Sequence, residues 1–309
     1  MENRKIIVGL GEILWDMLPS GKVLGGAPAN FAYFASQFGF DGYAVSAIGN
    51  DLLGKEILDN LAEKKLRFLL EKVDFPTGTV AVTLDEKGVP HYEICEGVAW
   101  DHIPFTAQTE MLARNCAAVC FGSLAQRNAV SRNTIQKFLE LVPKDAMKIF
   151  DVNLRQHFYT KEMIEHSLKQ SNILKINNEE LEILTEIFDW QGLSEEVVCK
   201  KILNDYALKM VVETKGEAGS FIFTNDDLSY IATPKVQVAD TVGAGDSFTG
   251  TLAAALLNGK TIREAHRLAV EVAAYVCTQH GAMPFVERDM FCRPKIGGFE
   301  IRQTISEKK

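Results

Sequence analysis

The sequence predicts an α/β protein with a mostly parallel central sheet, helices on both faces and a second, smaller sheet. Three observations support this. Short apolar runs recur along the chain, for example at residues 5–11, 43–49, 116–121 and 173–176. Most of them lead into segments of helical character, and such alternation is typical of parallel sheets whose strands are buried on both sides. Residues 71–104, in contrast, contain only short β-like pieces, which predicts a small sheet set apart from the rest.

The composition of the chain narrows the classes of function that we expect. With 47% hydrophobic and 24% charged residues, the 309-residue chain resembles an ordinary folded protein, and we expect one domain over residues 1–309. A net charge of −8 argues against a nucleic-acid or anionic-membrane partner. No apolar run approaches the ~18 residues of a membrane span. The six cysteines form no CxxC pair, a pattern typical of reduced thiols in a cytoplasmic protein.

The N-terminal third contains the first candidate ligand site. The strand at 5–11 is followed by Asp16, by a Pro-Ser-Gly turn and by the sequence GGAPAN at residues 25–30. The glycines let a backbone approach a small ligand, and Asn30 can donate and accept hydrogen bonds to a diol. An ordinary turn into a helix that ends at Gly39 explains the same residues. A second strand at 43–49 leads to a helix over 52–64, capped by Asn50 and Asp51.

Within residues 71–104, alternating runs at 79–84 and 89–95 flank the turn Asp85-Glu86-Lys87-Gly88 and predict a hairpin. Trp100 follows. It serves either as a core anchor or as a platform on which a ligand stacks.

Polar residues follow the next predicted strands, where the carboxyl ends of a parallel sheet form a ligand crevice. Ser131 is expected to cap a helix that runs to Leu141. Asp151, Asn153 and Arg155 follow the strand at 147–150. Arg155 can reach a phosphate with its fork of donors or form a surface ion pair.

Two further turns follow the strands at 173–176 and 209–213. Asn177 and Glu180 have the spacing of a helix capping box, which by itself explains them. The turn Thr214-Lys215-Gly216-Glu217-Ala218-Gly219 leads into a predicted hairpin with strands at 220–224 and 229–232, and a long helix is expected over 262–278.

Residues 238–259 (VADTVGAGDSFTGTLAAALLNG) carry the most specific pattern. A glycine turn leads directly into a helix predicted over 247–258. Unpaired N–H groups and the positive dipole end at a helix start bind anions. A carboxylate there opposes plain phosphate binding, but Asp246 fits if it takes a proton from a hydroxyl that attacks the phosphate. Alternatively, Asp246 is simply an acidic first-turn residue that complements the dipole.

The sequence DTVGAGDSFTG, residues 240–250, closely resembles the C-terminal signature of the ribokinase-like (PfkB) carbohydrate kinases. GGAPAN resembles their sugar-binding turn, in the version typical of fructokinase-like members, and residues 49–54 resemble their N-terminal signature. The resemblance covers nearly the whole chain. It implies a ribokinase-like fold in which segments at about 12–25 and 72–104 form a lid over the sugar and often a homodimer contact.

The resemblance also implies roles for individual residues. Asp246 would be the general base, with the backbone of Gly243, Ala244 and Gly245 as the anion hole. The sugar would be bound by Asp16, Gly26, Asn30 and Trp100. ATP would be bound by Arg155, Asn177, Glu180, Thr214, Gly216 and Gly219, with Mg²⁺ near the Asn177–Glu180 motif, and a monovalent cation such as K⁺ by the loop of Asp240 and Val242.

The expected function is ATP-dependent phosphorylation of a primary hydroxyl of a small sugar, with fructose converted to fructose 6-phosphate. Other acceptors remain open: ribose, another ketose, an aminoimidazole riboside or a nucleoside. A sugar-sensing protein that has lost catalysis is the alternative from a different class. The intact Gly-Ala-Gly-Asp at residues 243–246 argues against it.

Overall fold

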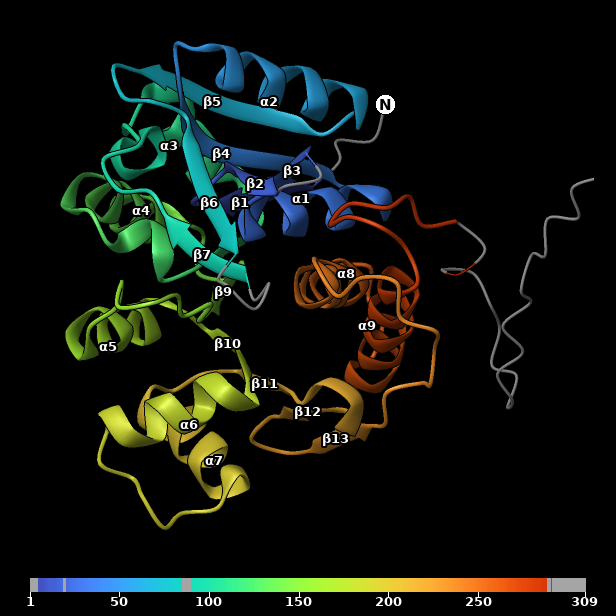
Figure 1. Cartoon of the computed structure of the whole chain (residues 1–309). Coiled ribbons are helices and arrows are strands. Elements are labelled where there is room, and N and C mark those ends of the chain that lie inside the picture. Colours follow the sequence, from blue (N-terminus) through green and yellow to red (C-terminus); the bar gives the residue numbers. More distant parts are fainter. Residues whose placement is uncertain (1–4, 19–20, 85–89, 288–289, 291–309) are drawn as a thin grey trace, which may run out of the picture.

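The computed structural model describes residues 5–18, 21–84, 90–287 and 290 (Figure 1). Over these residues the strands form a nine-stranded and a four-stranded sheet. The large sheet has the order β13-β12-β11-β10-β9-β8-β1-β4-β5, and its pairs from β5 to β11 are parallel. The strands β12 and β13 add an antiparallel hairpin, as predicted. The strands are β1 (Ile6–Leu10), β4 (Asp41–Gly49), β5 (Arg67–Val73), β8 (Cys116–Phe121), β9 (Met147–Asp151), β10 (Ile173–Asn177), β11 (Met210–Thr214), β12 (Ser220–Phe223) and β13 (Leu228–Ile231).

Helices cover both faces of the large sheet, so the predicted fold class is confirmed (Figure 1). Neighbouring strand residues point to opposite faces. Ile7 of β1 therefore packs into one core and Val8 into the other, which explains the continuous apolar runs. The core that contains Ile7 is covered by α1 (Ala27–Gln37), α2 (Leu52–Glu63), α8 (Ala244–Leu257) and α9 (Ile262–Cys277). The other is covered by α3 (Ala107–Asn115), α4 (Ala129–Leu141), α5 (Lys161–Gln170), α6 (Asn178–Ile187) and α7 (Glu195–Asp205).

The small sheet has the order β3-β2-β6-β7 and unites two segments that are far apart in the sequence. Its strands are β2 (Leu14–Leu18), β3 (Gly21–Gly25), β6 (Gly78–Leu84) and β7 (Pro90–Ile94). The prediction of a separate small sheet is confirmed, but residues 71–73 belong to β5 of the large sheet. The predicted turn at Asp85–Gly88 lies outside the described residues.

A buried ion pair fixes the chain where it leaves the small sheet. The Arg127 guanidinium donates to both carboxylate oxygens of Asp101, at 2.7 and 2.9 Å, and to the Cys95 carbonyl at 2.6 Å. It stacks 4.0 Å from the ring centre of Trp100, which has no exposed surface. Trp100 therefore serves as the core anchor, because its ring is enclosed and cannot be a platform for a ligand in this structure.

The predicted cap at Ser131 is wrong by three residues. Asn128 caps α4 by accepting the Val130 N–H. The Ser131 hydroxyl instead donates to the Trp100 carbonyl and accepts the Ile103 N–H. Its role is thus to join α4 to the residues after the small sheet.

The structure bears on two further expectations, the absence of a membrane span and the state of the cysteines. Within the described part of the chain, no helix combines the length and the apolar character that crossing a membrane requires. The cysteines described there are free thiols: Cys95, Cys116, Cys120, Cys199 and Cys277. That residues 1–309 form one domain stays a prediction.

Candidate active site

A cleft of about 370 Å³ lies at the carboxyl ends of β1, β9 and β10, below the small sheet and in front of the start of α8. It forms where the strand order reverses, since β1 lies between β4 and β8, and ligands of open α/β sheets bind at such a point. Of the residues singled out in the sequence, the cleft brings together Asp16, Gly26, Asn30, Arg155, Asn177, Glu180, Val242, Gly243, Gly245 and Asp246.

The start of α8 has the geometry of an anion site. Gly243 precedes the helix with φ of 78°, and a Cβ at this position would lie 2.4 Å from the Ala282 carbonyl oxygen, so only glycine fits. Within the described residues, the N–H groups of Gly245 and Asp246 have no acceptor, whereas that of Ala244 donates to the Thr241 carbonyl at 3.2 Å. The helix begins three residues earlier than predicted. Asp246 consequently lies in its first turn.

Asp246 lies half-buried in the wall of the cleft. Asn30 Nδ2 donates to its Oδ2 at 2.7 Å. Burial and the nearby carboxylate of Asp151 raise the pKa of Asp246 to about 6, against the lowering effects of Asn30, Lys175 and Arg155. The carboxylate is thus ionised at neutral pH but is a stronger base than an exposed aspartate.

Lys175 is a cation of the site that the sequence reasoning did not include. It is 8% exposed, and its Nζ lies 3.1 Å from Asp151 Oδ1 and 3.2 Å from where a Cβ on Gly245 would be. Burial alone would lower the pKa of Lys175, but Asp151, Glu180 and Asp246 outweigh it and raise it, so the side chain is charged. A lysine inside an apolar strand, Ile173-Leu174-Lys175-Ile176, was the available signal.

The capping box is present as predicted, and it has a second function. Asn177 Oδ1 accepts the Glu180 N–H, while Glu180 Oε2 accepts the Asn177 N–H at 2.9 Å. Glu180 Oε1 also accepts the Leu154 N–H at 3.1 Å. Glu180 therefore holds the turn after β9, from which Arg155 projects into the cleft, against the end of β10.

The opposite wall of the cleft comes from the turn before α1 and from β2. Gly26 has φ of 129°, and a Cβ there would lie 2.6 Å from the Glu12 carbonyl oxygen. Burial raises the pKa of Asp16, and Arg155 opposes this shift. Glu12, also missed in the sequence, lines the same cleft. The available signal was its place directly after Gly11 at the end of an apolar strand, since glutamate is rarely buried.

Six expected site residues lie outside the lining of this cleft: Trp100, Thr214, Gly216, Gly219, Asp240 and Ala244. The Ala244 N–H already donates to the Thr241 carbonyl, so the structure does not offer it to an anion. Trp100 is the buried core anchor described above, which corrects its assignment as a sugar contact. Thr214, Gly216 and Gly219 lie at the end of β11, and the pairing of Asn177 with Thr214 puts this turn beside the cleft. Their contact with a nucleotide stays a prediction.

Asp240, a residue of the predicted cation loop, also lies outside the cleft lining. Its carboxylate accepts the Val242 N–H at 3.0 Å and the Gly281 N–H at 3.2 Å, so it links the turn before α8 to the chain that follows α9. No group of three or more His, Cys, Asp or Glu suited to a metal is present among the described residues.

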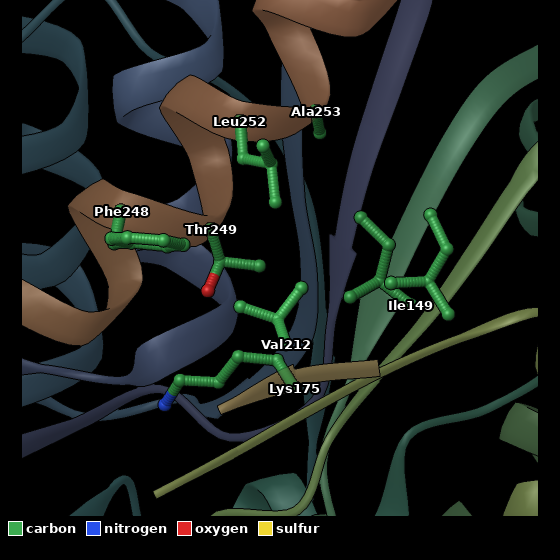
Figure 2. Close-up of a pocket in the computed structure, with 8 residues that line it drawn as sticks. Ile149, Lys175, Val212, Phe248, Thr249, Leu252 and Ala253 are labelled. Carbon is green, nitrogen blue, oxygen red and sulfur yellow. The ribbon is translucent and has the colours of Figure 1, made fainter. Parts of the chain in front are cut away.

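A small void of about 10 Å³ lies beneath the site, between α8 and the sheet (Figure 2). Its walls are apolar apart from the hydroxyl group of Thr249, and they include the aliphatic stem of Lys175. Figure 2 shows the Lys175 nitrogen extending away from the aliphatic side chains. Thr249 Oγ1 donates to the Gly245 carbonyl at 2.9 Å and so ties the first turn of α8 together. The void is lined by Ile149, Ile173, Lys175, Val212, Phe248, Thr249, Leu252 and Ala253.

Comparison with known proteins agrees with this geometry. Residues 20–288 match the model of the pfkB family of carbohydrate kinases. The chain is 28% identical over 295 residues to an ATP-dependent 6-phosphofructokinase of Thermoanaerobacterium thermosaccharolyticum, covering 90% of this chain and 89% of that protein. It is 26% identical over 308 residues to fructokinase-1 of Oryza sativa subsp. japonica, covering 91% and 94%. The structure of a fructokinase with bound ATP from Xylella fastidiosa superposes with a TM-score of 0.79 at 20% identity, over 91% and 94% of the two chains. The chain therefore belongs to the pfkB family of carbohydrate kinases, which are ATP-dependent sugar phosphotransferases.

Proposed function

We propose that this kinase phosphorylates a primary hydroxyl of a small sugar, with fructose as the first candidate, and that Asp246 is its general base. One observation carries the proposal. In a single cleft, the Asp246 carboxylate stands beside the acceptor-free N–H groups of the first turn of α8 and beside the Lys175 ammonium. A base and an anion site in contact are what transfer of a phosphoryl group to an alcohol requires.

In the proposed reaction, Asp246 removes the hydroxyl proton as the sugar oxygen bonds to the γ-phosphorus of ATP, and the bond from that phosphorus to the β-phosphate bridging oxygen breaks to release ADP. The N–H groups of Gly245 and Asp246 with Lys175 and Arg155 stabilise the charge on the transferred group. Closure of the small sheet over the sugar would exclude water, which is a competing acceptor.

The charge of the cleft also fits a nucleotide. Lys175 and Arg155 supply cations near the glycine turn. At Gly243 in this turn a Cβ would clash with Ala282. Mg²⁺ bound with ATP would lie near Asn177 and Glu180 and would neutralise phosphate charge. We propose that Thr214, Gly216 and Gly219 extend the nucleotide site, since their turn adjoins Asn177. The loop of Asp240 and Val242 is a proposed K⁺ site, and a homodimer through the small sheet is proposed from the family resemblance.

Fructose is favoured by the GGAPAN turn and by the 26% identity to fructokinase-1. The 28% identity to a 6-phosphofructokinase favours a second candidate, fructose 6-phosphate, because Arg155 is exposed at the cleft and can bind an acceptor phosphate. Ribose, other ketoses, nucleosides and a catalytically silent sugar sensor complete the set to be tested.

ATP consumption over a panel of these acceptors tests the proposal. We expect turnover of fructose, and a drop in kcat of about 10²–10⁴-fold in Asp246→Asn with ATP affinity retained. Asp227→Asn is the matched control, because Asp227 is an aspartate in an exposed ion pair with Arg263. A near-normal rate in Asp246→Asn would remove Asp246 from the base role, and turnover of no acceptor would favour the sensor.

A further inference from the structure

Glu12 is a buried carboxyl group that the proposed reaction leaves without a role. Its side chain is 3% exposed and lines the cleft, yet Oε2 has no hydrogen-bond partner within the described residues. Asn153 Nδ2 contacts the other oxygen, Oε1, at 3.4 Å. A buried, unpaired carboxyl oxygen costs free energy, so such a group usually marks a site where a ligand completes the hydrogen bonds.

The position of Glu12 indicates which ligand this is. Its carbonyl oxygen touches Gly26, and the chain continues from it directly into β2, which carries Asp16. The anion site, in contrast, is built from Gly245 at the start of α8 and Lys175 of β10. The unpaired oxygen therefore belongs to the wall proposed to hold the acceptor.

We propose that Glu12 is a substrate-binding residue that remains protonated and donates a hydrogen bond from its carboxyl O–H to an oxygen of the acceptor sugar. This proposal deepens the proposed function and rests on it. No proton leaves Glu12 in the reaction, because Asp246 takes the hydroxyl proton.

The charges around Glu12 favour the neutral form. Asp246 on α8 and Asp151 at the end of β9 face it as carboxylates, while Arg155 from the turn after β9 is the opposing cation. Burial is the largest effect and, with the two aspartates, raises the pKa of Glu12 to about 7 against the lowering by its own backbone N–H and by Arg155. Bound ATP would add negative charge and favour the protonated form further.

Two carboxyl groups with opposite requirements predict a bell-shaped dependence of kcat/KM on pH. Asp246 must be ionised, so the rate falls below pH of about 6, and Glu12 must be protonated, so the rate falls above pH of about 7. In Glu12→Gln the amide N–H replaces the donor. We expect kcat/KM within roughly tenfold of wild type at pH 6.5 and no decline on the alkaline side. Glu12→Ala, without a donor, should raise the KM for the acceptor roughly 10- to 100-fold.

Calorimetry provides a measurement that does not depend on turnover. When fructose binds at pH 8 in buffers of different ionisation enthalpy, we expect proton uptake by the wild type and none by Glu12→Gln. Glu213→Gln is the matched control, because Glu213 is also a buried glutamate, 2% exposed, with an oxygen that accepts no hydrogen bond and a pKa raised by burial, but it lies outside the cleft and beside Lys215. It should retain both the uptake and the alkaline decline.

The outcomes separate the two proposals. If the wild type phosphorylates fructose but takes up no proton, or if Glu12→Gln keeps the alkaline decline, the role of Glu12 is wrong while the kinase reaction stands. If the wild type neither binds nor phosphorylates any sugar of the panel, the proposed function and the role of Glu12 both fall.

Discussion

The cleft has two halves that are built differently. The phosphate half, made of Gly243–Asp246 with Lys175 and Asp151, consists mainly of backbone at a helix start and a buried ion pair. The acceptor half, made of Glu12, Asp16, Gly26 and Asn30, presents side chains with unpaired polar atoms, namely Glu12 Oε2 and Asn30 Oδ1. Among the described residues of the phosphate half, no buried side-chain nitrogen or oxygen lacks a hydrogen-bond partner, whereas the two such atoms of the acceptor half are available to a ligand.

This difference suggests that the phosphate half serves the transfer reaction and the acceptor half the choice of sugar. Backbone N–H groups and a fixed cation recognise any phosphoryl group, since they offer charge and donors without shape. Sugar hydroxyls are distinguished by individual side chains, and a site that leaves a buried polar atom unpaired discriminates strongly against the wrong ligand. Changes in the phosphate half should therefore lower kcat for every acceptor, and changes in the acceptor half should alter KM and the choice of acceptor.

The largest effect that tests this contrast is expected for Lys175→Met. Loss of the ammonium beside Gly245 removes charge stabilisation from the transferred group, and we expect kcat to fall by about 10²–10³-fold for all acceptors. Asp151, 5% exposed, would also lose its partner, which costs about 3–5 kcal/mol of unfolding free energy. Steady-state kinetics and thermal unfolding measure the two effects.

The double variant Lys175→Met/Asp151→Asn separates these effects. It removes both charges of the pair, so the unfolding temperature should recover while kcat stays low. Recovery of kcat along with stability would show that Lys175 acts only through the fold and that its charge does not stabilise the transferred group.

The same contrast explains what the sequence could predict. The glycine turn and helix at residues 238–259 are local, and the β-strands follow from apolar runs, so both were found. The pair of Lys175 and Asp151 was not, because it depends on the pairing of β10 with β9, which sets two residues 24 positions apart side by side. Spacing along the chain carries no such register.

The surroundings of individual side chains were the second feature that the sequence could not predict. The sequence left open whether Trp100 is a platform for a ligand or a core anchor, and its complete burial under the Arg127 guanidinium decides for the anchor. The sequence shows the acidic Glu12 at the end of an apolar strand. It does not show that one oxygen of Glu12 is buried without a partner, or that Asp151 and Asp246, from two distant segments of the chain, lie beside it. The acceptor half was therefore predicted less completely than the phosphate half.

A moderate effect is expected for Asn30→Ala, which joins the two halves. The Asn30 amide donates to Asp246 and thereby lowers its pKa, so its loss should move the acidic limb of kcat/KM from about 6 to higher pH. The rate at pH 6 should fall about tenfold more than the rate at pH 8, and the KM for the acceptor should rise because Oδ1 is also lost.

Asn60→Ala is the matched control for this experiment. Asn60 also has a buried, unpaired Oδ1, but it lies on α2, outside the cleft lining. It should leave the pH profile unchanged. An unshifted acidic limb in Asn30→Ala would mean that Asn30 does not set the basicity of Asp246 and would place it in the acceptor half alone.

The smallest effect is expected beneath the phosphate half, for Val212→Ile. Val212 is 1% exposed and lines the void of about 10 Å³ under Lys175, where one additional methyl group gains apolar contacts (Figure 2). We expect the unfolding free energy to rise by about 0.5–1 kcal/mol with kcat and KM unchanged, as measured by denaturant unfolding and kinetics. A loss of stability together with a lower kcat would show that the methyl group displaces Lys175, since overfilled cores shift their neighbours. The rigidity of the phosphate half would then depend on the space below its lysine as much as on the ion pair.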